Sequence, residues 1–280
     1  MQGITGSEGS FHTARMTAAG TNVVAGTSPG KGGRKVAGVP VFDDCPAAVA
    51  ATGADVAVTF APAPFAADAL MEAVAAGLRL VVCITEGIPV HDMMRVVAGC
   101  ERRGAHLVGP NCPGVVSVGE ADVGIMPAEI FAPGAVGLVS RSGTLTYQIV
   151  DELSRAGIGQ STCVGMGGDA VHGLGFSACL AMFDDDAATE AVVLIGEIGG
   201  DQEERAAAFV RERMHKPVVA YIAGFTAPPG RIMGHAGAIV SGGKGTAAAK
   251  AEALAAAAVP VARRPDEVPR LVRAALSRRA

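Results

Sequence analysis

The stretch that decides the fold reads DVAVTF at residues 55–60, AADALMEAVAA at 66–76, LRLVVCIT at 78–85 and VHDMMRVVAGCERR at 90–103. The first and third pieces are short and rich in β-branched residues, whereas the second and fourth carry apolar residues at helical spacing. Alternation of this kind is typical of βαβ units, in which consecutive strands lie parallel in one sheet. The stretch therefore predicts an α/β fold.

The same alternation extends outward in both directions. Further strand candidates lie at residues 23–25, 106–108, 135–139, 162–165, 191–195, 217–222 and 259–262. Between Val116 and Pro133 the pattern weakens into a mixed glycine, proline and acidic segment, as expected at a domain boundary. We therefore expect two α/β domains with parallel sheets, over residues 1–120 and 130–280.

Composition excludes several classes of protein. The net charge is -4, there is no Trp, and no dense basic stripe is present, which argues against nucleic-acid binding. Charges interrupt every apolar stretch before the roughly 18 residues that a membrane helix needs. The first ten residues do not resemble a signal peptide, and the six cysteines are scattered without a C-x-x-C pair. We expect a cytoplasmic protein with reduced thiols and no metal site of its own.

Two glycine-rich segments near the N-terminus are candidate phosphate sites. Gly3-Ile-Thr-Gly-Ser-Glu-Gly9 precedes a helix expected from about Ser10, and free amides at a helix N-terminus attract phosphate. The G-x-G-x-x-G spacing of a dinucleotide site is absent, as is the acidic residue about 20 positions on that such a site requires. In Pro29-Gly-Lys-Gly-Gly33, Lys31 could pair with a phosphate. Each segment alone could equally be a plain flexible loop.

A third small-residue turn, Ser140-Arg-Ser-Gly-Thr144, connects a predicted strand to a predicted helix that begins just after Gly143. Such a turn exposes N–H groups that can hold an anion. A nucleophilic serine is the rival interpretation. It is disfavoured because Ser140 and Thr144 stand where the two glycines of a G-x-S-x-G elbow should be.

The most chemically informative histidine lies in Met233-Gly-His-Ala-Gly-Ala-Ile239, where small neighbours keep its ring accessible. A lone histidine is more often structural. However, Glu197 follows the apolar strand predicted at residues 191–195, at the edge of the sheet where ligands of α/β proteins collect. A carboxylate there could fix the tautomer of His235 and support a nucleophilic ring nitrogen, although Glu197 could also be an ordinary loop acid.

Taken in order, these motifs resemble the α subunit of succinyl-CoA synthetase over nearly the whole chain. The matching segments are residues 5–9 (TGSEG), 29–33 (PGKGG), 61–65 (APAPF), 84–89 (ITEGIP), 109–114 (GPNCPG), 140–147 (SRSGTLTY), 159–165 (GQSTCVG), 196–200 (GEIGG) and 234–239 (GHAGAI). The resemblance implies a Rossmann-like CoA-binding domain followed by a flavodoxin-like ligase domain.

The resemblance also implies roles for individual residues. His235 would be the phosphohistidine, Glu197 its carboxylate partner, and Ser142 with Gly143 the helix start that cradles the phosphoryl group, while Tyr147 would lie near the carboxylate substrate. The residues implied for coenzyme A are Thr5, Gly6, Ser7, Glu8, Lys31, Ile84, Thr85 and Glu86, with Asn111 and Cys112 close by.

In that family, phosphate attacks the acyl-CoA, and the histidine carries the phosphoryl group from the acyl phosphate to a nucleotide. The resemblance implies a β subunit with an ATP-grasp domain that holds Mg²⁺ and ADP/ATP or GDP/GTP, in a heterodimer or heterotetramer. Two alternatives stay open: a malate–CoA ligase, which resembles the same subunit, and a CoA-binding module without catalysis.

This sequence departs from the family pattern at two places. Family members usually have a further strand before the glycine turn, whereas only Met1 and Gln2 precede Gly3 here, so we expect the first strand to be missing or the start codon to be wrongly assigned. The segment at residues 166–172, MGGDAVH, replaces a proline-containing version, and we expect its effect to be local.

Overall fold

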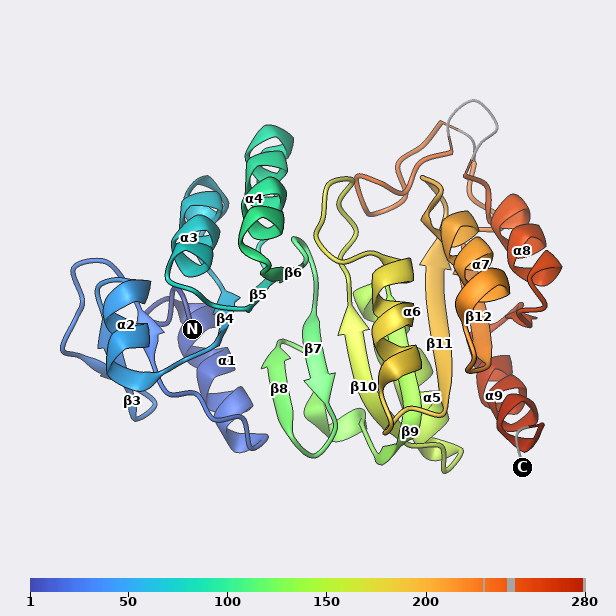
Figure 1. Cartoon of the computed structure of the whole chain (residues 1–280), viewed down its shortest axis with the longest axis horizontal. Helices are drawn as coiled ribbons and strands as arrows, with labels where there is room; N and C mark the ends of the chain where they lie inside the picture. The colour runs from blue at the N-terminus through green and yellow to red at the C-terminus, as the bar shows by residue number, and fades with distance from the viewer. Residues whose placement is uncertain (229, 241–244, 279–280) are drawn as a thin grey trace. The chain divides into compact units, whose positions relative to one another are not determined.

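The computed structural model describes residues 1–228, 230–240 and 245–278. It contains two compact α/β units, coloured from blue to green and from green to red in Figure 1. The N-terminal unit comprises Met1–Met126 together with Val171–Gly173, and the C-terminal unit comprises Pro127–Ala170 and Leu174–Ala280.

The strands of the N-terminal unit are mostly parallel. Its strands are β1 (Gly26–Thr27), β2 (Lys35–Val36), β3 (Val39–Phe42), β4 (Val56–Thr59), β5 (Leu80–Cys83) and β6 (His106–Val108). β4, β5 and β6 run parallel, as do β1 and β3, whereas β2 is antiparallel to β3. Gln2 forms parallel bridges with both Thr27 and Thr59, so a single residue joins the two halves of the sheet.

The prediction of a strand at residues 23–25 is wrong, because the residues that pair with β3 are Gly26 and Thr27 of β1. The N–H of Thr27 donates to Met1 O at 2.8 Å and the N–H of Gly3 donates to Thr27 O at 2.9 Å. The Met1 ammonium donates to Ala25 O at 3.0 Å, and burial lowers the pKa of this amine to about 6. The chain start thus takes the central position between β1 and β4.

Four helices pack in the N-terminal unit: α1 (Ser7–Ala18), α2 (Cys45–Thr52), α3 (Ala63–Ala75) and α4 (Val90–Arg103). Leu70 of α3 and Val96 of α4 are fully buried in a core with Val81 of β5. α1 begins at Ser7 rather than near Ser10, because Gly3 at φ +77° turns the chain and accepts the Gly6 N–H at 3.0 Å. A left-handed turn of this kind favours glycine.

The segment expected to be a domain boundary contains an antiparallel hairpin, β7 (Gly114–Ser117) and β8 (Ala121–Gly124). Gly114 and Gly124 face each other so closely that a Cβ on either would lie less than 3 Å from the other's Cα. The Thr21 hydroxyl donates to Asp122 O at 2.7 Å and accepts from its N–H at 2.8 Å, which ties the hairpin to the N-terminal unit. Sequence periodicity missed these strands because they are short and contain glycine and an acid.

The C-terminal unit is built on five parallel strands in the order β13-β12-β11-β9-β10. Their bounds are β9 (Pro133–Ser140), β10 (Gln160–Gly165), β11 (Ala191–Glu197), β12 (Val218–Ala223) and β13 (Val261–Ala262), and a short 3-10 helix, η1 (Ala128–Ile130), precedes them. β11 is buried along its whole length, as a central strand covered on both faces should be.

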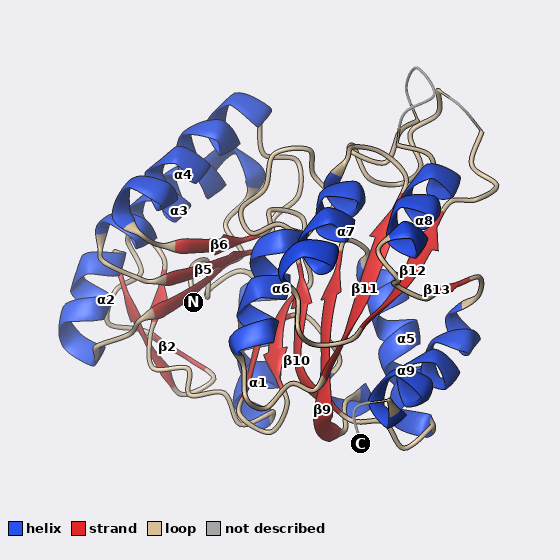
Figure 2. Cartoon of the chain, turned by 45° about the vertical axis from the view of Figure 1, so that its right-hand side comes forward, coloured by secondary structure: helices blue, strands red, loops and turns tan. Residues whose placement is uncertain are grey.

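Helices cover both faces of this sheet. Figure 2 shows α6 (Phe176–Asp185), α7 (Gln202–Arg213) and α8 (Ala247–Ala256) in front of the strands, with α5 (Gly143–Arg155) and α9 (Val268–Ser277) behind them. A second 3-10 helix, η2 (Pro265–Glu267), precedes α9. Within the described residues, no helix is long and apolar enough to span a membrane.

Candidate functional site

The carboxyl ends of β9 and β11 lie side by side. Ile195 of β11 is in register with Ser140, the last residue of β9, and the Arg141 N–H donates to Ile195 O at 3.1 Å. Glu197, the last residue of β11, is therefore held next to the turn that leads from β9 into α5. Ligands of parallel α/β sheets bind at this edge.

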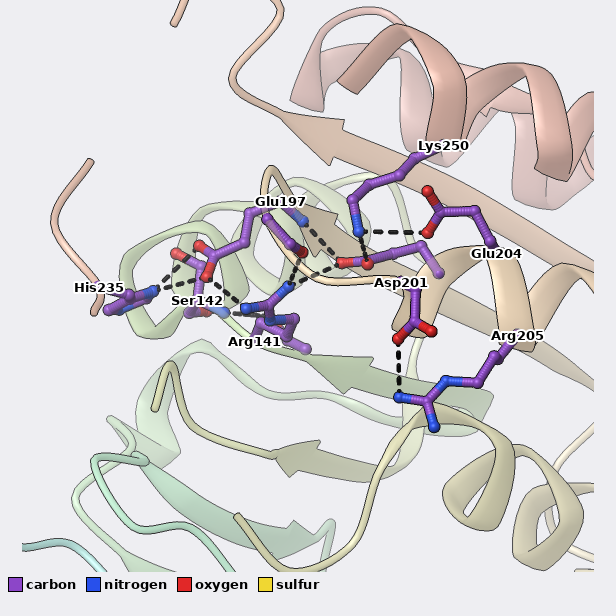
Figure 3. A network of polar contacts seen from close by, with 11 residues as sticks. Arg141, Ser142, Glu197, Asp201, Glu204, Arg205, His235 and Lys250 are labelled. Atoms are coloured by element: carbon purple, nitrogen blue, oxygen red, sulfur yellow. Dashed lines mark hydrogen bonds and ion pairs between the residues drawn. The ribbon is translucent and has the colours of Figure 1, made fainter. Parts of the chain in front are cut away.

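His235 and Glu197 are brought together, although they are far apart in the sequence. Nδ1 of His235 lies 2.9 Å from Glu197 Oε1 and 3.0 Å from Oε2. Figure 3 marks both contacts with dashed lines. The Glu197 side chain is only 9% exposed, whereas that of His235 is 25% exposed. With Nδ1 engaged by the carboxylate, Nε2 is the ring nitrogen left for chemistry.

The charges around His235 act in opposite directions. The hydrogen bond that the ring donates to Glu197 raises the pKa of His235 above its usual value, burial of the ring opposes that change, and Arg141 also opposes it. The charge of Asp169 adds a smaller upward effect on the pKa. A ring with a neighbouring carboxylate and a partly exposed face is suited to a nucleophile or a general base.

Glycines let the backbone pass close to this ring. A Cβ on Gly168 would lie 2.2 Å from His235 Cγ, so only glycine fits there. A Cβ on Gly199, whose φ is +90°, would lie 1.9 Å from Gly237 O. Gly168 belongs to the segment at residues 166–172, which differs from the family pattern. This segment therefore lies against His235, a contact that the sequence analysis did not predict.

Arg141 is a buried cation behind Glu197. Its Nη2 lies 3.4 Å from Glu197 Oε1, and its Nη1 lies 3.3 Å from Glu203 Oε1 and donates to Gly199 O at 3.1 Å. Glu203 lies in the first turn of α7, and its side chain is fully buried and bonded to Lys250. The signal that could have indicated this site is the single arginine in the turn at residues 140–144, where every other residue is small.

The serine turn forms a regular helix start. α5 begins at Gly143, and Ser142 is its N-cap, accepting the Leu145 N–H at 3.4 Å. The Ser142 N–H donates to the Ser140 hydroxyl at 3.1 Å, which is therefore a structural partner. Tyr147 lies in the second turn of α5 and is half-buried. Free N–H groups in the first turn of α5 make this end attractive to an anion.

The first group of residues expected to bind coenzyme A is also assembled. Lys31 Nζ donates to Thr5 Oγ1 at 3.1 Å, and Thr5 Oγ1 lies 2.7 Å from Ser28 Oγ. Gly6 is the N-cap of α1 without a side chain to cover the first amides, and Ser7 and Glu8 form the first turn. A lysine, two hydroxyls and open helix amides are the donors that a diphosphate requires.

The second group lies beyond the ends of β5 and β6 in the same sheet. The Thr85 hydroxyl donates to Ala61 O at 2.7 Å, and the Asn111 N–H donates to Thr85 O at 3.0 Å. Ile84 and Glu86 flank Thr85. Cys112 donates through Sγ to Cys83 O at 3.2 Å, and burial raises its pKa, so it is not a reactive thiol.

A groove of about 510 Å³ runs beside the first group. Gly3, Ser28, Pro29, Ala61 and Phe65 contribute to its walls. Phe65 is 65% exposed, which leaves an apolar ring available beside the polar turn. Flat apolar rings next to phosphate donors are suited to a ligand with both a diphosphate and an aromatic base.

This chain is similar to known proteins over nearly its whole length. A family model described as a CoA binding domain matches residues 1–87, and one described as CoA-ligase matches residues 139–260. A succinate–CoA ligase [ADP-forming] subunit alpha 2 of Archaeoglobus fulgidus is 58% identical over 272 residues, which are 97% of this chain and 94% of that protein. This chain belongs to the family of succinate–CoA ligase α subunits.

Other relatives extend the same likeness. The succinate–CoA ligase [ADP-forming] α subunit of Aquifex aeolicus is 57% identical and that of Methanothermobacter thermautotrophicus 53%, over 96% and 99% of this chain and 88% and 94% of those proteins. A solved ATP citrate lyase from Methanothrix soehngenii, in complex with citrate and coenzyme A, matches with a TM-score of 0.80 and 29% identity. The match covers 86% of this chain and 41% of that one, so this chain spans less than half of the solved protein.

Proposed function

We propose that this chain performs phosphoryl transfer in an ADP-forming succinate–CoA ligase and that His235 is the residue transiently phosphorylated. The observation that carries the proposal is the 2.9 Å bond between His235 Nδ1 and the buried Glu197 carboxylate. This bond keeps the ring proton on Nδ1, so the lone pair of Nε2 is free for nucleophilic attack.

The reaction divides into three transfers. Phosphate attacks the thioester carbonyl of succinyl-CoA, the C–S bond breaks, and succinyl phosphate and coenzyme A form. The Nε2 lone pair of His235 then attacks phosphorus, the bond from phosphorus to the carboxyl oxygen breaks, and succinate leaves. The phosphoryl group finally passes to ADP and restores the neutral ring. Throughout, Nδ1 keeps its proton and Glu197 balances the charge that the ring acquires.

The start of α5 stabilises the phosphoryl group in this proposal. Ser142 and Gly143 present the helix amides, which favour negative charge without needing to reorganise. Tyr147, one turn further along, would contact the carboxylate substrate. Dianionic phosphate beside Glu197 is unfavourable by charge alone, so donors on the opposite side of the ring are needed.

Coenzyme A would bind to the N-terminal unit. Thr5, Gly6, Ser7, Glu8 and Lys31 would hold its diphosphate, with the base in the groove beside Phe65. The thiol-bearing arm would pass Ile84, Thr85, Glu86, Asn111 and Cys112. The close bonds of Lys31 and Thr5, and the uncapped start of α1, support this assignment.

The nucleotide site would be supplied by a β subunit with an ATP-grasp domain, in a heterodimer or heterotetramer. The relatives are named as α subunits, which supports a second chain. Mg²⁺ and the nucleotide would bind to that partner. A cytoplasmic location suits the six free, buried cysteines.

Mixing the chain with its β subunit and ATP tests the proposal. An acid-labile mass increase of one phosphoryl group should appear on His235 and should be absent in His235→Asn. His215→Asn is the matched control, because His215 also pairs with a carboxylate, Asp184, at 2.8 Å but is 85% exposed and should be dispensable. A normal adduct in His235→Asn would overturn the assignment.

Substrate choice is tested in the same mixture. Succinate should support CoA-dependent ADP formation at a higher kcat/KM than malate, in keeping with the names of the relatives. A preference for malate would identify a malate–CoA ligase instead. Binding of coenzyme A without turnover of either acid would favour a non-catalytic module.

A further inference from the structure

Behind Glu197, buried charges of alternating sign run away from the reacting histidine. Lys250 of α8 bonds to Glu203 Oε2 of α7, and both side chains are fully buried. Glu203 Oε1 accepts from Arg141 Nη1 at 3.3 Å and from the backbone N–H of Glu197 at 3.1 Å. Arg141 Nη2 in turn lies 3.4 Å from Glu197 Oε1. Figure 3 shows Arg141 beside Glu197.

Burial of these charges needs a reason other than stability. Removing an ion pair from water is costly, and apolar residues of similar size often stabilise a fold as well or better. The reaction proposed above uses Glu197 and His235 but leaves Lys250 and Glu203 without a role. Both lie on helices that border the site, and Glu203 contacts the backbone and the cation that hold Glu197.

We propose that Lys250 and Glu203 are a positioning pair that fixes Arg141 between two carboxylates and thereby sets how strongly Glu197 holds His235. The inference deepens the proposed function and rests on the role given there to His235. Neither Lys250 nor Glu203 touches the reacting atoms, so they act through Arg141.

Glu197 and Glu203 compete for the guanidinium of Arg141. Lys250 neutralises Glu203, which leaves Arg141 free to keep Nη2 on Glu197. Glu197 is then shared between Arg141 and the Nδ1 proton of His235, so the carboxylate orients the ring while Arg141 limits how far Glu197 raises the pKa of His235. An imidazolium has no lone pair on Nε2 and cannot accept a phosphoryl group.

Two single variants should shift the pKa of His235 in opposite directions. In Lys250→Met, uncompensated Glu203 draws Arg141 away from Glu197, so the pKa of His235 rises. In Glu203→Gln, Arg141 turns fully onto Glu197, so the pKa of His235 falls. Each shift should be about 0.5 pH unit or more, since a neighbouring charge typically moves a pKa by about one unit or more.

Other charged groups must be held constant in the comparison. Glu197, Arg141 and Asp169 face His235 directly, and Glu204 lies 3.4 Å from Lys250 Nζ on the far side. None of these changes in the two variants. Arg205→Met is the matched control, because Arg205 is a cation on the same helix as Glu203 but pairs with the exposed Asp201, and its loss should leave the pKa of His235 unchanged.

The measurement is an NMR pH titration of the His235 ring in the whole chain, with the rate of His235 phosphorylation by the β subunit and ATP recorded over the same pH range. We expect the acid limb of the rate profile to move upward in Lys250→Met and downward in Glu203→Gln. Opposite shifts support the proposal, and shifts in one direction, or none, overturn it. The NMR titration does not need phosphorylation. Failure of the proposed function would therefore be seen separately, as a wild-type chain that is not phosphorylated by ATP and the β subunit.

A second variant covers loss of folding, because removing one partner of a buried pair is strongly destabilising whereas removing both is tolerated. In the double variant Glu203→Gln with Lys250→Met, Glu197 is the only charged partner left to Arg141 among the residues that the structure describes. A crystal structure should show Arg141 Nη2 closer to Glu197 Oε1 than 3.4 Å, and the pKa of His235 should be below that of the wild type. An Arg141 that stays in place would contradict a positioning role.

Discussion

Replacing Gly168 with alanine should disable the histidine through a single methyl group. The new Cβ would lie 2.2 Å from Cγ, 2.5 Å from Cδ2 and 2.5 Å from Nδ1 of His235. An ordinary contact starts at 3.4 Å, so the ring has to withdraw by about 1.2 Å, the difference between 3.4 and 2.2 Å. Such a shift removes Nδ1 from its 2.9 Å bond with Glu197. Misplacement of a reacting group by about 1 Å costs roughly 100-fold in rate.

The assay is the initial rate of His235 phosphorylation by ATP and the β subunit, and we expect it to fall about 100-fold in Gly168→Ala. Gly157→Ala is the control, because Gly157 has φ +73° and open space around it, so the substitution strains the backbone without approaching the site. It should lower the free energy of unfolding by about 1 kcal/mol and leave the rate unchanged. Near wild-type phosphorylation in Gly168→Ala would refute the described geometry.

Three further results are expected. Glu197→Gln should lower the pKa of His235 toward its usual value and slow phosphorylation about 10- to 100-fold. In the wild type, the His235–Glu197 pair stabilises the fold below pH about 6.5, and this stabilisation is lost as the pH rises through the raised pKa of His235. Urea unfolding over a pH series should show that this pH-dependent stabilisation is missing in Glu197→Gln. Lys31→Ala should weaken CoA binding about 10-fold by calorimetry, with a smaller salt dependence than the wild type, and an unchanged affinity would count against the diphosphate site. Iodoacetamide should label the cysteines only after denaturation, because all six are buried and burial raises the pKa of Cys45 to about 12; rapid labelling of the native chain would contradict this packing.

Much of the α/β pattern is visible in the sequence. The strand predicted at residues 191–195 is β11, and the helix predicted after Gly143 is α5. Both are decided locally, one by a continuous apolar run and the other by a small-residue turn followed by an apolar stripe. The hairpin β7–β8 was not predicted, because its pairing depends on the close approach of Gly114 and Gly124 across the two strands. The spacing of apolar residues along the sequence does not reveal a cross-strand contact of this kind.

The site divides in the same way. His235 and Glu197 could be predicted to meet, because each follows a parallel strand and the carboxyl ends of such strands share one edge. Glu203 could not be placed from sequence, since an acid in the first turn of a helix is usually exposed, and its burial follows only from the packing of α7 against α8. The contact of Gly168 with the histidine ring likewise depends on how two loops meet.

The central claim is that Nε2 of His235 accepts the phosphoryl group, and identifying the phosphorylated ring nitrogen tests it most directly. After reaction of ¹⁵N-histidine-labelled chain with ATP and the β subunit, NMR should show the phosphoryl group of His235 on Nε2, with Nδ1 protonated and bonded to Glu197. A phosphoryl group on Nδ1, or on any residue other than His235, would contradict it.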